Sequence, residues 1–256
     1  MHPATGTLAA TLAGLCTCVG ALGVFFIKRL STSVEDALLS CAAGIMLAAS
    51  FFSLILPGIA YAEALGYSRV PAVGTVVVGI LAGAVLIWLI HHYTPHEHFV
   101  QGREGPSTER LKQIWLFVIT ITLHNLPEGM AVGIGFADGT LDSGVTLATG
   151  IGLQNIPEGL AVATALVAAG YRRFFSFGGA TLTGLIDGLG GLLGSLATWL
   201  AQPIMPATLG FAAGAMLYII SDEIIPETHR RGYETLATFS LLGGFVMMMF
   251  LDATLG

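Results

Sequence analysis

The sequence predicts an all-α integral membrane protein with eight transmembrane helices. Of its 256 residues, 54% are hydrophobic and only 10% are charged, and the mean hydropathy is +0.81. A soluble domain carries about 25% charged residues because its surface must face water. We therefore expect one polytopic membrane domain over residues 1–256. The net charge of −6 says little about nucleic acid, but no basic cluster or stacking aromatic array appears, so we expect no nucleic-acid partner.

The length and spacing of the apolar segments give the number of spans. A helix that crosses the hydrocarbon core of a bilayer needs roughly 20 apolar residues. The predicted spans are residues 5–27, 37–57, 70–90, 114–136, 143–168, 175–201, 207–225 and 236–254. The first has no basic segment before it and no cleavage site after it, so we interpret it as a membrane helix and not a signal peptide. One connection is long and polar, the histidine-bearing loop 91–113.

The basic residues indicate how the spans are oriented. Nine of the ten Lys and Arg residues fall between spans 1 and 2, 3 and 4, 5 and 6, or 7 and 8, and only Arg69 lies on the other side. Loops that carry Lys and Arg stay in the cytoplasm. The loop 91–113 is therefore predicted to be cytoplasmic, and both termini are predicted to be extracytoplasmic.

A six-residue motif occurs twice, each time in the middle of an apolar span. It reads HNLPEG at 124–129 and QNIPEG at 154–159. The first residue and the glutamate of each copy are four positions apart, so they share one face of a helix. Each proline removes a backbone N–H and should kink its helix, which would free a carbonyl group at the level of the polar side chains. Interrupted helices of this kind form midplane binding sites in transporters.

The charges inside the spans favour a cation site. Glu128, Glu158 and Asp187 lie near the middle of spans 4, 5 and 6, and no Lys or Arg lies within any span. Deep carboxylates without a basic partner must be protonated or must hold a cation. One imidazole, two or three carboxylates and several amide oxygens suit a borderline divalent ion such as zinc, with iron or manganese tolerated. Two glutamates on facing helices can also bridge two ions.

The paired motifs, the eight spans and the histidine-bearing loop resemble the ZIP (Zrt/Irt-like protein) family of metal transporters, and its prokaryotic GufA-type members in particular. The resemblance implies a 3+2+3 fold, in which spans 1–3 and 6–8 are inverted repeats around spans 4 and 5. It also implies zinc-preferring uptake of divalent cations into the cytoplasm across the cell inner (plasma) membrane. Cadmium, iron and manganese are further candidate cargoes, and a homodimer is the implied assembly.

The same resemblance implies two adjacent metal positions. The primary position would use His124, Glu128, Gln154 and Glu158. The second would use Asn125, Glu128, Asn155, Glu158 and Asp187. Some relatives have Asp in place of Asn155 and Glu in place of Asp187, so this chain brings less charge or reach to the second position.

A transport pathway follows from residues on either side of this site. Met46 and Ser53 in span 2 match positions that line the outer approach in similar proteins, although ordinary core packing explains Met46 equally well. Asp252, near the outer end of span 8, is predicted to be an interfacial carboxylate with no ligand role. The predicted cytoplasmic release route comprises His91, His96, His98, Asp222 and Glu223.

Two other classes of function remain as alternatives. An integral-membrane metalloenzyme would need an H-E-x-x-H signature or several histidine boxes, but only His124 lies within a span. A proton-coupled antiporter of another solute could use Glu128 and Glu158 as proton carriers, yet His124 and the matched amides fit a metal better. A metal sensor is disfavoured because no sizeable soluble domain is present. We therefore predict a transporter without enzymatic activity.

Overall fold

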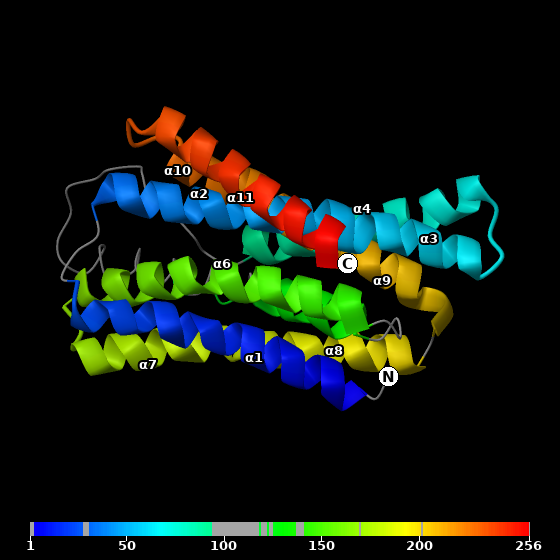
Figure 1. Cartoon of the computed structure of the whole chain (residues 1–256), viewed down its shortest axis with the longest axis horizontal. Coiled ribbons are helices and arrows are strands. Elements are labelled where there is room, and N and C mark those ends of the chain that lie inside the picture. The colour runs from blue at the N-terminus through cyan, green and yellow to red at the C-terminus, as the bar shows by residue number, and fades with distance from the viewer. Residues whose placement is uncertain are drawn as a thin grey trace.

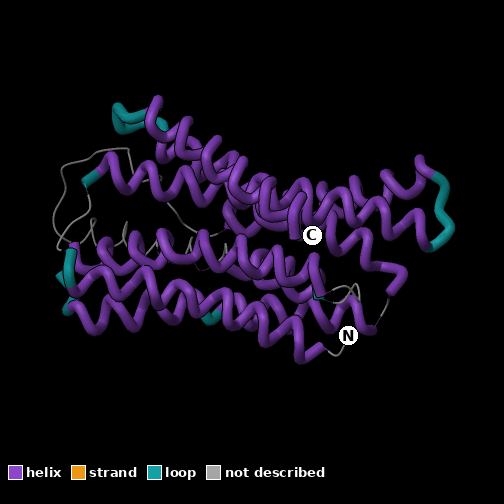
Figure 2. Tube along the Cα trace, viewed as in Figure 1, coloured by secondary structure: helices purple, strands orange, loops and turns teal. Residues whose placement is uncertain are grey.

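The structure is a computed structural model, and it describes residues 3–27, 31–93, 118, 122, 125–136, 141–168, 170–200 and 202–255. Within these ranges the chain is helical almost throughout and contains no strand. Figure 2 shows short loops joining the helices at the two ends of an elongated molecule. The predicted all-α class is confirmed.

Six helical segments are long and apolar enough to cross a membrane. They are Pro3–Phe25, Thr32–Ala64, Arg69–Ile90, Arg173–Ala197, Met205–Thr228 and Glu234–Thr254. These correspond to predicted spans 1, 2, 3, 6, 7 and 8. Span 5 corresponds to the 28-residue helix α6 (Leu141–Ala168), whose centre is polar. Span 4 is described mainly over residues 125–136, of which 125–135 are helical.

The helices form two layers (Figure 1). One layer contains α1 (Pro3–Ala21), which packs on α6, on α7 (Arg173–Gly184) and on α8 (Ile186–Leu200). In the other layer, two helix pairs pack closely. The pairs are α2 (Thr32–Ala48) with α11 (Glu234–Leu255), and α4 (Arg69–Tyr93) with α9 (Met205–Ile219). Helix α6 contacts both α2 and α11, so it lies where the layers meet.

Two spans change their helical geometry before a proline. In the second span, a π-helical segment (Ala49–Ile55) joins α2 to α3 (Leu56–Ala64), and Pro57 follows. In the seventh span, a π-helical segment (Ile220–Ile224) joins α9 to α10 (Ile225–Thr228), and Pro226 follows. The N–H groups of Leu56 and Ile225 donate to the carbonyl five residues back. Such widened turns occur often at functional sites.

Two details differ from the sequence-based expectations. The second span is 33 residues long and extends beyond the predicted 37–57 at both ends. The sixth span, expected to be continuous over 175–201, is interrupted at Leu185 between α7 and α8. Helix α6 contains Pro157 within one helical segment. The interruption therefore falls beside Asp187 and not at the motif proline.

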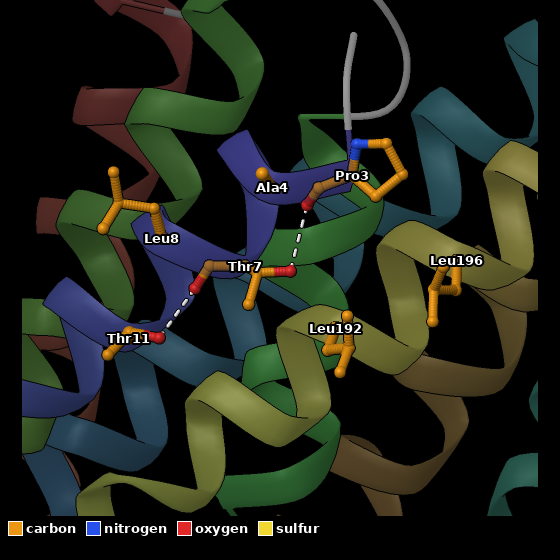
Figure 3. Close-up of a pocket in the computed structure, with 7 residues that line it drawn as sticks. All are labelled: Pro3, Ala4, Thr7, Leu8, Thr11, Leu192 and Leu196. Carbon is orange, nitrogen blue, oxygen red and sulfur yellow. Dashed lines mark hydrogen bonds between the residues drawn. The ribbon is translucent and has the colours of Figure 1, made fainter.

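A groove of about 590 Å³ lies between α1 and α8. Figure 3 shows its lining, which comprises Pro3, Ala4, Thr7, Leu8, Thr11, Leu192 and Leu196. The hydroxyls of Thr7 and Thr11 donate to the carbonyls of Pro3 and Thr7, at 2.9 and 2.8 Å. Because its hydroxyls bond within their own helix, this groove offers mainly apolar contacts and is no candidate for a cation.

Candidate metal site

The structure brings the two motif copies together inside the protein. Glu128, on the 125–135 helix, and Gln154, on α6, are both fully buried. The amide Nε2 of Gln154 donates to Oε1 of Glu128 at 2.6 Å. Glu158, one helical turn beyond Gln154, is 4% exposed. The i, i+4 spacing within α6 therefore places an amide and a carboxylate toward the same polar centre.

A second pair of polar side chains lies beside the first. The amide Nδ2 of Asn155 donates to Oδ2 of Asp187 at 2.7 Å and to the carbonyl of Ala13 at 3.1 Å. Both side chains are fully buried. This contact joins three elements, because Ala13 belongs to α1, Asn155 to α6 and Asp187 to α8.

The interruption of the sixth span explains how Asp187 reaches this position. Helix α7 ends at Gly184, and Asp187 lies in the first turn of α8. The amide Nδ2 of Asn125 donates to the carbonyl of Thr183 at 2.7 Å, which satisfies a backbone acceptor where the helix stops. A carboxylate in the first turn of a helix is also favoured by the helix dipole. The first motif copy therefore stabilises the break that positions Asp187.

Glycines allow the 125–135 helix and α8 to lie unusually close. A Cβ on Gly129 would overlap the backbone of Asp187, and a Cβ on Gly190 would overlap the carbonyl of Leu126. Small residues at such interfaces let helix backbones approach each other in lipid. The approach fixes the distance between the helices that carry Glu128 and Asp187.

The unused hydrogen-bonding atoms of this centre are oxygens. The amide nitrogens of Asn125, Gln154 and Asn155 all donate hydrogen bonds. Their amide oxygens, and one carboxylate oxygen each of Glu128 and Asp187, are buried without a hydrogen-bond partner. Buried polar atoms are normally paired, because leaving one unsatisfied costs about 1–3 kcal/mol. A divalent cation can be coordinated by several carboxylate and amide oxygens at once.

The donors are of mixed chemical type. Among the described residues, no three His, Cys, Asp or Glu side chains converge closely enough to hold an ion by themselves. His124, the predicted imidazole ligand, lies outside the described residues. Within the described part, carboxylates alternate with amides, and such a donor set suits a weakly held divalent ion.

The predicted outer approach contains a contact that sequence reasoning missed. Ser53 lies in the π-helical segment Ala49–Ile55, and its hydroxyl donates to Oδ1 of Asp252 at 2.6 Å. Asp252 had been assigned no role, and the pairing of residues 199 positions apart left no local signal. Met46 is fully buried in the main apolar core.

The predicted release route is only partly described. Asp222 and Glu223 lie in the second π-helical segment, Ile220–Ile224, and both are half-buried. His91 belongs to helix α4, but its side chain lies outside the described part, as do residues His96 and His98.

A partly buried ion-pair cluster lies near the end of the seventh span. Arg231 lies 3.4 Å from Oδ1 of the fully buried Asp36 and 3.3 Å from Oε2 of Glu35, and it also pairs with Glu227. Burial opposes the charge on Arg231, but the carboxylates outweigh it and raise the pKa of the guanidinium. Sequence reasoning placed Arg231 in a loop and did not single out Asp36. The cluster ties the start of α2 to the segment after α10.

Comparisons with known proteins agree with this architecture. The profile of the ZIP zinc transporter family matches residues 90–252. The chain is 45% identical to the zinc transporter ZIPB of Bordetella bronchiseptica, over all of this chain and 83% of that protein. The chain belongs to the ZIP family.

Other relatives extend the similarity within the ZIP family. The zinc transporter GufA of Myxococcus xanthus is 41% identical over 98% of this chain and 99% of that protein. Human zinc transporter ZIP11 is 33% identical over 94% of each chain. The resemblance seen in the sequence is therefore confirmed, and the protein is a multi-pass membrane transporter whose cargo is zinc. Since these relatives are named as transporters, the metalloenzyme alternative loses its support.

Proposed function

We propose that this ZIP-family protein carries zinc into the cytoplasm through two adjacent cation positions at mid-membrane. The observation that carries the proposal is the set of buried oxygens without partners, contributed by the 125–135 helix, α6 and α8. Each amide nitrogen donates to a protein acceptor, whereas the amide oxygens have no hydrogen-bond partner.

The two positions follow from the two hydrogen-bonded pairs. The primary position would use His124, Glu128, Gln154 and Glu158. The contact between Gln154 and Glu128 supports it, because both side chains reach one point. The second would use Asn125, Glu128, Asn155, Glu158 and Asp187. The contact between Asn155 and Asp187 supports it in the same way.

An internal repeat supports the 3+2+3 arrangement. The sequence AAGIML at 42–47 recurs as AAGAML at 212–217, and each copy is followed by a π-helical segment and a proline. Helices α2 and α9, which carry these copies, run in opposite directions (Figure 1). We therefore propose that spans 1–3 and 6–8 are inverted repeats, with both termini outside the cytoplasm.

The repeat also relates the two ends of the proposed pathway. Ser53 in the first π-helical segment and Glu223 in the second are separated by 170 positions, the same offset as the AAGxML copies. We propose that Met46, Ser53 and Asp252 form the outer approach. Asp222, Glu223 and the histidines of loop 91–113 would then form the inner release route. Rocking of one helix group against the other would expose the site to each side in turn.

Cargo range, membrane and assembly complete the proposal. Cadmium, iron and manganese share the ligand preferences of zinc closely enough to be carried as well. The least buried spans contain α4 and α11, each with 17% of its apolar window buried inside the protein. Their wide apolar faces suit lipid and a second copy of the chain, so we propose a homodimer in the cell inner membrane.

Zinc uptake into proteoliposomes tests the site assignment. The wild type is compared with His124→Ala and Glu158→Ala, for zinc and for cadmium. Glu63→Ala is the control, because Glu63 forms an exposed ion pair with Arg69. Both site variants should lose uptake while the control retains it. Wild-type uptake in both site variants would refute the assignment.

A further inference from the structure

Thr17 differs from Thr7 and Thr11, two other threonines of helix α1. Thr7 and Thr11 donate to the carbonyl four residues back, as the dashed lines in Figure 3 show. The same bond is made in other helices by Thr75, Thr149, Thr208, Thr238 and Thr254. Thr17 is 1% exposed, and its Oγ1 has no hydrogen-bond partner.

The acceptor that Thr17 would ordinarily use is also contacted by a side chain of the metal site. That acceptor is the carbonyl of Ala13, which accepts a hydrogen bond from Nδ2 of Asn155 at 3.1 Å. The same Nδ2 donates to Asp187. The hydroxyl of Thr17 is left without a hydrogen-bond partner one helical turn from Ala13, whose carbonyl Asn155 contacts.

The surroundings of Thr17 place its hydroxyl at the interruption of the sixth span. A Cβ on Gly184, the last residue of α7, would collide with Oγ1 of Thr17. One helical turn earlier, a Cβ on Gly14 would lie only 2.9 Å from Oδ2 of Asp187. Helix α1 therefore presents Gly14 to the Asp187 carboxylate and Thr17 to the break just before it.

We propose that Oγ1 of Thr17 is a further ligand of the cation in the second position, together with Asp187 and Asn155. Oδ1 of Asp187 and Oδ1 of Asn155 are also buried without hydrogen-bond partners. A hydroxyl is a neutral, hard oxygen ligand, so it completes the coordination of zinc without adding charge. Helix α1 then contributes a ligand to the site, in addition to the 125–135 helix, α6 and α8. This inference rests on the proposed function.

Three substitutions at position 17 test the assignment by zinc and cadmium uptake into proteoliposomes. Thr17→Val keeps the shape and removes the hydroxyl, so the KM for zinc should rise about tenfold. Thr17→Ser keeps the hydroxyl and should retain a KM close to the wild type. Thr17→Cys replaces the hard oxygen with a soft sulfur, so the ratio of cadmium to zinc transport should rise.

Thr146 on α6 provides the matched control. It is fully buried, and its hydroxyl also lacks a partner. It precedes Gln154 by eight residues, about 12 Å along the helix. Thr146→Val should leave the KM and the cadmium-to-zinc ratio unchanged. The inference is overturned if Thr17→Val behaves like Thr146→Val, or if Thr17→Cys and Thr17→Ser show the same ratio.

Glu128→Ala, measured in the same series, distinguishes failure of the Thr17 assignment from failure of the proposed cation site. Loss of uptake in Glu128→Ala with a wild-type KM in Thr17→Val would overturn the role of Thr17 alone. Retained uptake in Glu128→Ala would overturn the proposed site itself.

Discussion

Replacing Gly190 by alanine tests whether close packing of α8 on the 125–135 helix holds the site together. A Cβ at this position would overlap the carbonyl oxygen of Leu126 and lie 2.8 Å from the amide nitrogen of Met130. Ordinary contacts between non-bonded heavy atoms are about 3.5–4.0 Å long. Both colliding atoms belong to the backbone, so no side-chain rotation relieves the overlap. The two helices must move apart.

The expected size of the effect follows from two opposing contributions. Alanine in place of glycine favours a helix by about 1 kcal/mol. Overpacking of a tight interface costs about 1–3 kcal/mol. The net result should be a destabilisation of up to about 2 kcal/mol, which lowers the thermal unfolding midpoint by a few degrees in a protein of this size. Separation of Glu128 from Asp187 should also raise the KM for zinc.

The assay is thermal unfolding of the purified protein, with and without zinc, together with proteoliposome uptake. Gly74→Ala on α4 is the matched control, because a Cβ there meets nothing within 4 Å. This control should be as stable as the wild type or slightly more stable, with unchanged uptake. The packing argument fails if Gly190→Ala shows the stability and uptake of Gly74→Ala.

Three further predictions concern the charged and polar contacts. Arg231→Ala should destabilise the protein by about 3 kcal/mol, since it leaves the buried Asp36 without its ion-pair partner. A thermal unfolding midpoint equal to that of the wild type would contradict this. Adding Asp36→Asn to Arg231→Ala should restore part of the lost stability. Ser53→Ala should raise the KM for zinc with little change in maximal rate, because it removes the hydrogen bond that orients the outer carboxylate of Asp252; concentration-dependent uptake decides the point. Glu128→Gln should abolish uptake yet raise the unfolding midpoint measured without zinc, since it removes a buried carboxylate; a lowered midpoint would argue that Glu128 mainly supports the fold.

Much of the architecture is predictable from the sequence because lipid imposes a simple constraint. Apolar segments of about 20 residues must be helical to satisfy their backbone groups. The polar centre is equally visible, because Glu128, Gln154 and Asp187 are costly inside apolar spans and therefore conspicuous. The structure then brings these residues together as hydrogen-bonded pairs, through Gln154 with Glu128 and Asn155 with Asp187.

Features that depend on contacts between distant residues are not visible in the sequence. The break before Asp187 contains no proline, and it depends on a hydrogen bond from Asn125 to Thr183, 58 positions away. The contact of Asn155 with the carbonyl of Ala13, one turn before the unpaired Thr17, joins residues 142 positions apart. Asp36 is an unremarkable residue at the start of a span until Arg231 is seen beside it.

The amide groups of Gln154 and Asn155 have a consequence for the release of cargo. Each already occupies one oxygen of a carboxylate, at 2.6 and 2.7 Å. The other oxygen of each carboxylate has no partner. An ion that also takes the hydrogen-bonded oxygen must displace a bond of about 1.5–3 kcal/mol, so it binds roughly ten- to a hundredfold more weakly than its ligands alone would dictate. Under the proposed function, the amide N–H groups of Gln154 and Asn155 therefore compete with the cation for the carboxylates. When the ion departs, the amides reclaim the carboxylates, and the site returns to the state from which the next cycle begins.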